Sequence, residues 1–82
     1  MFAIARFTVP LADAAHFEAH LNTALDAFSQ CAGFKSGEFG QNLDEPTLWS
    51  LTTNWENVGS YRRALSNNNV KMNAIPILAQ AI

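Results

Sequence analysis

The spacing of apolar residues changes from a strand pattern to a helical pattern within the first third of the chain. Residues 2–9 (FAIARFTV) are rich in Phe, Ile, Thr and Val and stop at Pro10, which predicts a first strand. Both faces of this strand are largely apolar, so we expect it to be covered on both sides. From Ala12 to about Cys31 the period is helical, and Gly33 lies where this helix should stop. The apolar stripe of the helix consists of Ala14, Phe17, Leu21, Ala24, Leu25 and Phe28.

The second half of the chain begins with the pattern of a hairpin and continues with short helices. Residues 34–41 and 47–53 read as strands, joined by the turn-forming residues 42–46 (NLDEP). A helix is predicted from about Trp55 to Leu65, with Asn54 as its N-cap and Val58, Tyr61 and Leu65 on one face. Three asparagines at 67–69 end it, residues 70–74 form one helical turn, and Pro76 opens a last helix that runs to Ile82.

The order of these elements is β-α-β-β-α followed by helical segments. It predicts one domain over residues 1–82 in the α+β class, a ferredoxin-like sandwich with an antiparallel sheet. The other face of the sheet is expected to be apolar as well, so a second copy of the chain could cover it.

Composition narrows the classes of partner. Charged residues make up only 15% of the chain, against a usual share of about 25%, which favours self-association. A net charge of −2, with scattered basic residues, gives no footprint for nucleic acid. No apolar run approaches the roughly 18 residues of a membrane span. The single cysteine excludes an internal disulfide and fits a reducing compartment. We therefore expect a soluble cytoplasmic homodimer that binds neither nucleic acid nor membrane.

Several local motifs are shared with a known family. The long helix is followed by Gly33-Phe34, and the third strand leads to Trp55, then ENV, then Tyr61. The tail VKMNAIPILAQAI adds a further similarity. Together with the element order, these motifs resemble the antibiotic biosynthesis monooxygenase (ABM) domain of the dimeric α/β-barrel superfamily. The resemblance covers nearly the whole chain.

The resemblance implies a fold and a chemistry. Two sheets would pack face to face in a homodimeric barrel, and each subunit would keep a pocket between its sheet and helices. Family enzymes oxidise aromatic polyketides or quinols with molecular oxygen and without metal or flavin, so no cofactor is expected. Members usually add a fourth strand after the last helix, often exchanged with the partner. This sequence ends at Ile82 before such a strand.

The resemblance also implies catalytic residues. In the polyketide-oxidising branch an Asn, a Trp and a Tyr cooperate; Trp55 and Tyr61 match by spacing, whereas Leu51 stands in place of the Asn. Asn54 is the candidate substitute. Trp55 could stack a flat substrate and donate from its indole N–H, and Tyr61 could move a proton. The structural alternatives are a packing wedge for Trp55, a boundary residue for Tyr61 and a helix cap for Asn54.

Three further residues are candidates for binding substrate. Arg6 places a charge on an apolar strand, and this charge requires a carboxylate or a ligand as its partner. A structural ion pair is the simpler of the two explanations. Trp49 would fill the core or the dimer interface, and His20 lies near the edge of the apolar stripe, where it could act as a base. His16 and His20 have the i, i+4 spacing of metal ligands, but no third ligand follows, so we predict no metal site.

Two functions therefore remain open. One is cofactor-independent monooxygenation of a flat aromatic or quinol-type molecule; the other is a non-catalytic dimeric module that binds a small apolar or aromatic ligand. A metal-dependent isomerase or hydrolase using the two histidines is a weaker third. The haem-degrading branch of the family is disfavoured, because its Asn on the first strand and its His on the second helix have no counterpart.

Overall fold

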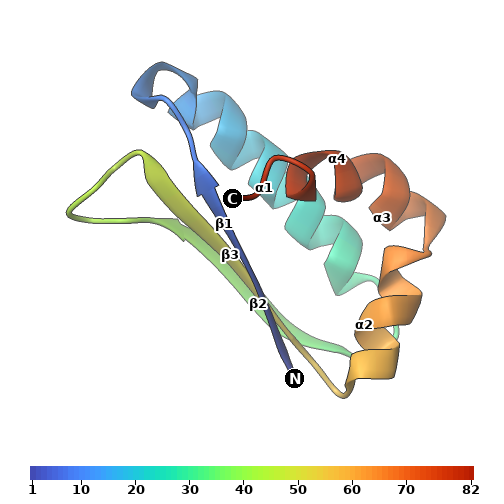
Figure 1. The fold of residues 1–82 in the computed structure, drawn as a ribbon. Helices are drawn as coiled ribbons and strands as arrows, with labels where there is room; N and C mark the ends of the chain where they lie inside the picture. Colours follow the sequence, from blue (N-terminus) through green and yellow to red (C-terminus); the bar gives the residue numbers. More distant parts are fainter.

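A computed structural model describes every residue from Met1 to Ile82 (Figure 1). The element order confirms the prediction of an α+β chain with an antiparallel sheet. The strands are β1 (Phe2–Thr8), β2 (Phe34–Gln41) and β3 (Leu48–Trp55). A 3-10 turn, η1 (Leu11–Asp13), precedes the long helix α1 (Ala14–Ser29), and three short helices follow the sheet: α2 (Val58–Leu65), α3 (Asn68–Asn73) and α4 (Ile75–Leu78).

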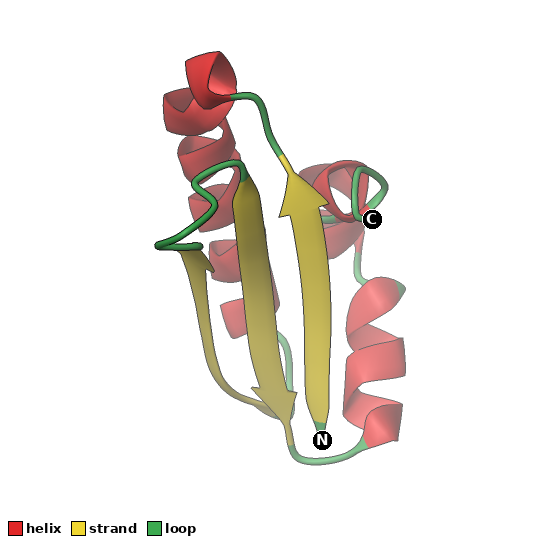
Figure 2. Cartoon of the chain, turned by 60° about the vertical axis from the view of Figure 1, so that its left-hand side comes forward, coloured by secondary structure: helices red, strands yellow, loops and turns green.

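The sheet has β3 at its centre, in the order β1-β3-β2, and both pairings are antiparallel. All the helices cover the same face of this sheet, and the other face is uncovered (Figure 2). Because side chains alternate along a strand, every second residue of β3 points to the helices. These residues are Trp49, Leu51, Thr53 and Trp55, and all four are buried.

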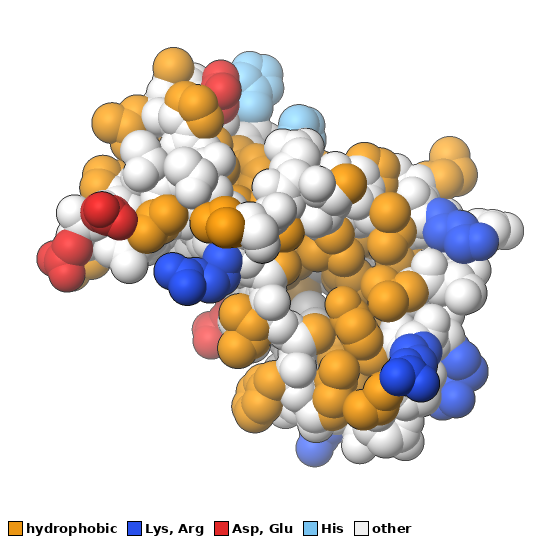
Figure 3. All heavy atoms as spheres, viewed as in Figure 1, with side chains coloured by type: hydrophobic (Ala, Val, Ile, Leu, Met, Phe, Trp, Pro, Cys, Tyr) orange, Lys and Arg blue, Asp and Glu red, His pale blue; other side chains and the backbone are white.

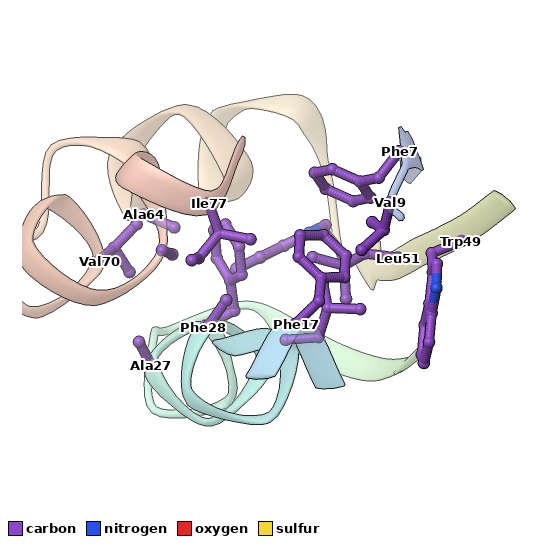
Figure 4. Packing of buried hydrophobic residues seen from close by; sticks show 14 residues of the cluster. Phe7, Val9, Phe17, Ala27, Phe28, Trp49, Leu51, Ala64, Val70 and Ile77 are labelled. Atoms are coloured by element: carbon purple, nitrogen blue, oxygen red, sulfur yellow. The ribbon is translucent and has the colours of Figure 1, made fainter. Parts of the chain in front are cut away.

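The core lies between the sheet and α1. The predicted stripe of α1 is confirmed, since Phe17, Leu21, Ala24 and Phe28 are buried, with Ala14 and Leu25 packed at the margin. Phe7 meets Phe17 edge to face at 5.0 Å between ring centroids (Figure 4). Phe28 meets Trp55 in the same way at 5.8 Å.

The uncovered face of the sheet is mixed, so the expectation that this face is apolar is correct only in part. Phe2 and Ile4 on β1 are 67% and 66% exposed. The central strand instead contributes Ser50, Thr52 and Asn54 to this face, because its apolar residues other than Leu48 occupy the helix-facing positions. Apolar surface is therefore concentrated along β1.

The joint between β3 and α2 lies later in the chain than predicted. Backbone hydrogen bonds with Met1 extend the β ladder to Trp55, which is the last residue of β3 and not the first of a helix. Asn57 caps α2: its side chain accepts from the Ser60 N–H at 2.8 Å. The expectation that Asn54 caps this helix is therefore wrong.

The inward face of α2 agrees with the prediction only in part. Tyr61 and Leu65 pack against the core as predicted, but Val58 is 45% exposed, and Ser60 and Ala64 are the buried residues of the helix. None of the helices combines the length and apolar character needed to cross a bilayer.

The chain returns to β1 at its end. Asn67 caps α3 by accepting from the backbone N–H groups of Asn69 and Val70. Pro76 lies in the first turn of α4 as predicted, but this helix ends at Leu78 and does not run to Ile82. After α4 the N–H of Ile82 donates to the carbonyl of Arg6 at 2.8 Å. The C-terminal residues therefore lie beside β1, on the strand edge that does not pair with β3.

Candidate functional site

A small cavity lies between the sheet and the helices, next to β1. Its volume is about 40 Å³. Five elements line it through Ala3, Ile4, Ala5, Phe28, Leu51, Thr53, Tyr61 and Leu78. The side chains that line it are apolar apart from the hydroxyl groups of Thr53 and Tyr61. The cavity has the character of a ligand site, an apolar enclosure with few polar groups.

A larger groove of about 510 Å³ continues from this cavity. The two share Ile4, Ala5, Tyr61 and Leu78, and the groove adds Arg6, Ala81 and Ile82. Figure 3 shows hydrophobic side chains gathered around a hollow at the centre of this face. The inner cavity is too small for an aromatic ring, whereas the groove can hold one. Tyr61 lines both spaces and so stands where they meet.

Tyr61 is held by other aromatic rings. Its ring centroid lies 6.4 Å from Phe28 in a stacked arrangement and 5.6 Å from Trp55. Desolvation by burial raises the pKa of the Tyr61 phenol above its usual value of 10. The phenol is therefore protonated at neutral pH and can donate a hydrogen bond to a ligand.

Trp55 lies behind the cavity wall and is fully buried. Its indole packs edge to face against Phe28 and Phe34, and its Nε1–H donates to Oγ1 of Thr53 at 2.8 Å. This is the geometry of the packing wedge. In this arrangement the indole reaches the cavity only through its neighbours Thr53 and Tyr61.

Asn54 and Trp49 lie away from the cavity. Asn54 belongs to the uncovered face of the sheet, where it lines a shallow cleft with Phe2 and Glu38. Trp49 is buried near the other end of β3, with Phe17 at 5.9 Å and Phe39 at 6.5 Å. Its Nε1–H is buried without an acceptor.

Arg6 and His20 occupy different surfaces. Arg6 is the one charged residue that lines the groove, and the ion pair expected for it is not formed. His20 shares a separate polar cleft of about 230 Å³ with His16 and Asp13. No group of three or more His, Cys, Asp or Glu side chains is arranged to hold a metal ion. Of the six candidates, the structure thus brings only Tyr61 and Arg6 into one groove.

Thr53 is the polar residue of the cavity that sequence reasoning missed. A threonine on a strand carries no signal of its own, because β-branched residues are common there. The spacing of Thr53 from Trp55 was nevertheless informative. Residues i and i+2 of a strand share a face, so Thr53 had to lie beside the indole. The alanines at positions 3 and 5, which leave room for the cavity, follow the same rule on β1.

The chain is similar to known proteins in its sequence pattern and in its fold. A sequence model described as antibiotic biosynthesis monooxygenase matches residues 1–72. No curated protein sequence matches the chain. Among solved structures, SnoaB, a cofactor-independent oxygenase from Streptomyces nogalater, is 25% identical with a TM-score of 0.81, covering 99% of this chain and 81% of SnoaB.

Two other solved structures share the fold at lower identity. A conserved protein from Methanosarcina mazei is 16% identical with a TM-score of 0.82, covering 99% of this chain and 79% of that one. A candidate antibiotic biosynthesis monooxygenase from Deinococcus radiodurans is 19% identical with a TM-score of 0.80, covering 96% and 78%. At these identities the similarity is evidence for the fold alone.

Proposed function

The chain belongs to the antibiotic biosynthesis monooxygenase family, and on that basis we propose that it is a cofactor-independent monooxygenase acting on a flat aromatic or quinol-type molecule. The observation that carries the proposal is the apolar cavity and groove that meet at Tyr61. The similarity to SnoaB, named as a cofactor-independent oxygenase, supports the same reaction type.

In the proposed reaction the substrate supplies the electrons. An anthrone, for example, loses two hydrogens from its CH₂ carbon and gains one oxygen atom from O₂, while the second oxygen atom leaves as water. The ring would lie in the groove against Leu78, with the reacting carbon near Tyr61. The apolar walls exclude water, and the neutral phenol of Tyr61 would donate to the developing oxygen anion and pass a proton.

We further propose that the protein works as a homodimer. Phe2 and Ile4 are two-thirds exposed on the uncovered face of the sheet, and β1 and β2 are both edge strands. A second copy packed on this face would remove that apolar surface from water. Sedimentation should then give a particle of twice the 9.0 kDa chain mass at micromolar concentration. A particle of one chain mass would refute the dimer.

Oxygen uptake tests the proposed reaction. The protein is incubated with an anthrone or a quinol under ¹⁸O₂, and label in the product is measured against a control without protein. Tyr61→Phe should lower the rate by at least about 100-fold if the phenol moves a proton. His16 lies in a separate cleft, so His16→Ala should leave the rate unchanged. A rate equal to that of the control without protein would leave only a ligand-binding role.

A further inference from the structure

The hydrogen bond between Trp55 and Thr53 fixes more than the position of the indole. A threonine hydroxyl has one proton to donate and lone pairs to accept with. In Thr53 the Oγ1 accepts from the Trp55 Nε1–H at 2.8 Å, and it donates to no protein acceptor. The hydroxyl proton of a side chain that is 97% buried is therefore left without a partner, since Thr53 is only 3% exposed.

The residues around Thr53 indicate that its hydroxyl proton points into the cavity. Thr53 lines the cavity together with Tyr61, and the other lining side chains are apolar. An indole N–H cannot act as an acceptor, so the Trp55 side of the hydroxyl is closed to its proton. A buried hydroxyl proton without an acceptor is costly, and a ligand acceptor placed in the cavity would remove that cost.

We propose that Thr53 is a ligand-binding residue that donates to an oxygen acceptor in the inner cavity, and that Trp55 is a positioning residue that orients the Thr53 hydroxyl. With the neutral phenol of Tyr61, the cavity then presents two donors and no competing carboxylate. Such a pair selects a ligand with a carbonyl, enolate or phenolate oxygen over one with a bare hydrocarbon edge. This assignment rests on the proposed function, which places the ring of the ligand in the groove. It adds that Thr53 is the residue that recognises the oxygen of the ligand.

The cavity dimensions agree with this assignment. About 40 Å³ holds an oxygen substituent or a few water molecules, and the ring must remain in the adjoining groove. The ligand would therefore enter with its oxygen foremost. Leu51, on the same face of β3, offers this oxygen no hydrogen bond, so Thr53 is the polar group that β3 supplies to the cavity.

A pair of matched probes tests the proposal by binding alone. Anthraquinone-2-sulfonate and anthracene-2-sulfonate carry the same charge and ring system and differ in the carbonyl oxygens. Calorimetry on the full chain should show the quinone bound about tenfold more tightly, the value of one or two hydrogen bonds. Thr53→Val should bring this ratio close to one, Thr53→Ser should keep it, and Trp55→Phe should lower it.

The ratio separates recognition from folding, because a damaged fold weakens binding of both probes together. The indole proton of Trp55 gives a second readout: its NMR signal should shift in Thr53→Val, while that of Trp49, the only other tryptophan, stays in place. A ratio unchanged in Thr53→Val, or wild-type protein that does not prefer the quinone, would overturn the proposal. If the ratio behaves as expected but no ¹⁸O enters an anthrone, the oxygenase proposal fails and the role of Thr53 stands.

Discussion

The α-carbon of Gly33 lies directly against the side chain of Ser60, so that a Cβ on Gly33 would overlap both Oγ and Cβ of the serine. Gly33 also has a φ of +85°, a conformation that side chains with a Cβ rarely adopt. Its carbonyl accepts from the Glu56 N–H at 2.9 Å. This contact joins the turn after α1 to the start of α2, the helix that carries Tyr61.

We expect Gly33→Ala to lower the free energy of unfolding by about 2–4 kcal/mol, the sum of left-handed backbone strain and overpacking. Urea unfolding followed by tryptophan fluorescence measures this change. Gly40→Ala is the matched control, because a Cβ there meets nothing within 4 Å and φ is not positive. Equal stability of the two variants would contradict the close approach of Gly33 and Ser60.

Asn57→Ala should lower the free energy of unfolding by about 1 kcal/mol, because the Asn57 side chain accepts from both the N–H and the hydroxyl of Ser60 at the start of α2. Thermal or urea unfolding would detect the loss. Asn54→Ala is the comparison, since Asn54 lies on β3 and makes no cap. A larger loss for Asn54→Ala would place the start of α2 where the sequence alone had suggested.

These two asparagines show where sequence reasoning reached its limit. The element order and the stripe of α1 follow from local periodicity, and both were predicted correctly. The joint after β3 was not, because both Asn54 and Asn57 have the propensity of a cap. Pairing with Met1, more than fifty residues away, carries β3 to Trp55 and leaves the cap to Asn57. Local propensity contains no information on that contact.

The candidate site, like the fold, could be predicted only in part. The family resemblance pointed to Tyr61 through its spacing after Trp55, and Tyr61 lines the cavity in the structure. The cavity itself depends on small residues of β1 and on Leu78 of α4, which approach one another only in the folded chain. The displacement of Trp55 from the cavity wall also follows from packing, since Phe28 and Phe34 hold the indole behind Thr53.

The sole tyrosine of the chain should titrate above pH 10 in the folded state. Burial disfavours the phenolate of Tyr61, so absorbance at 295 nm should rise at a higher pH in native protein than in urea. Between these two pKa values the native state holds a proton that the unfolded state has lost. Stability should therefore fall as pH rises above about 10, and Tyr61→Phe should lack this component. Coincident native and urea titrations would show that the phenol is solvated.

The two tryptophans should differ in how well the fold tolerates their loss. Both indoles are buried, at 5% exposure for Trp49 and 0% for Trp55, and both substitutions by Phe remove similar volume. Trp55→Phe removes a hydrogen-bonded N–H, whereas Trp49→Phe removes an N–H that has no acceptor. An unsatisfied buried donor costs about 1–3 kcal/mol, so Trp49→Phe should destabilise less than Trp55→Phe by about that amount. Urea unfolding monitored by circular dichroism measures both variants without relying on the fluorophores. Equal losses would mean that the Trp49 N–H finds a water acceptor in solution.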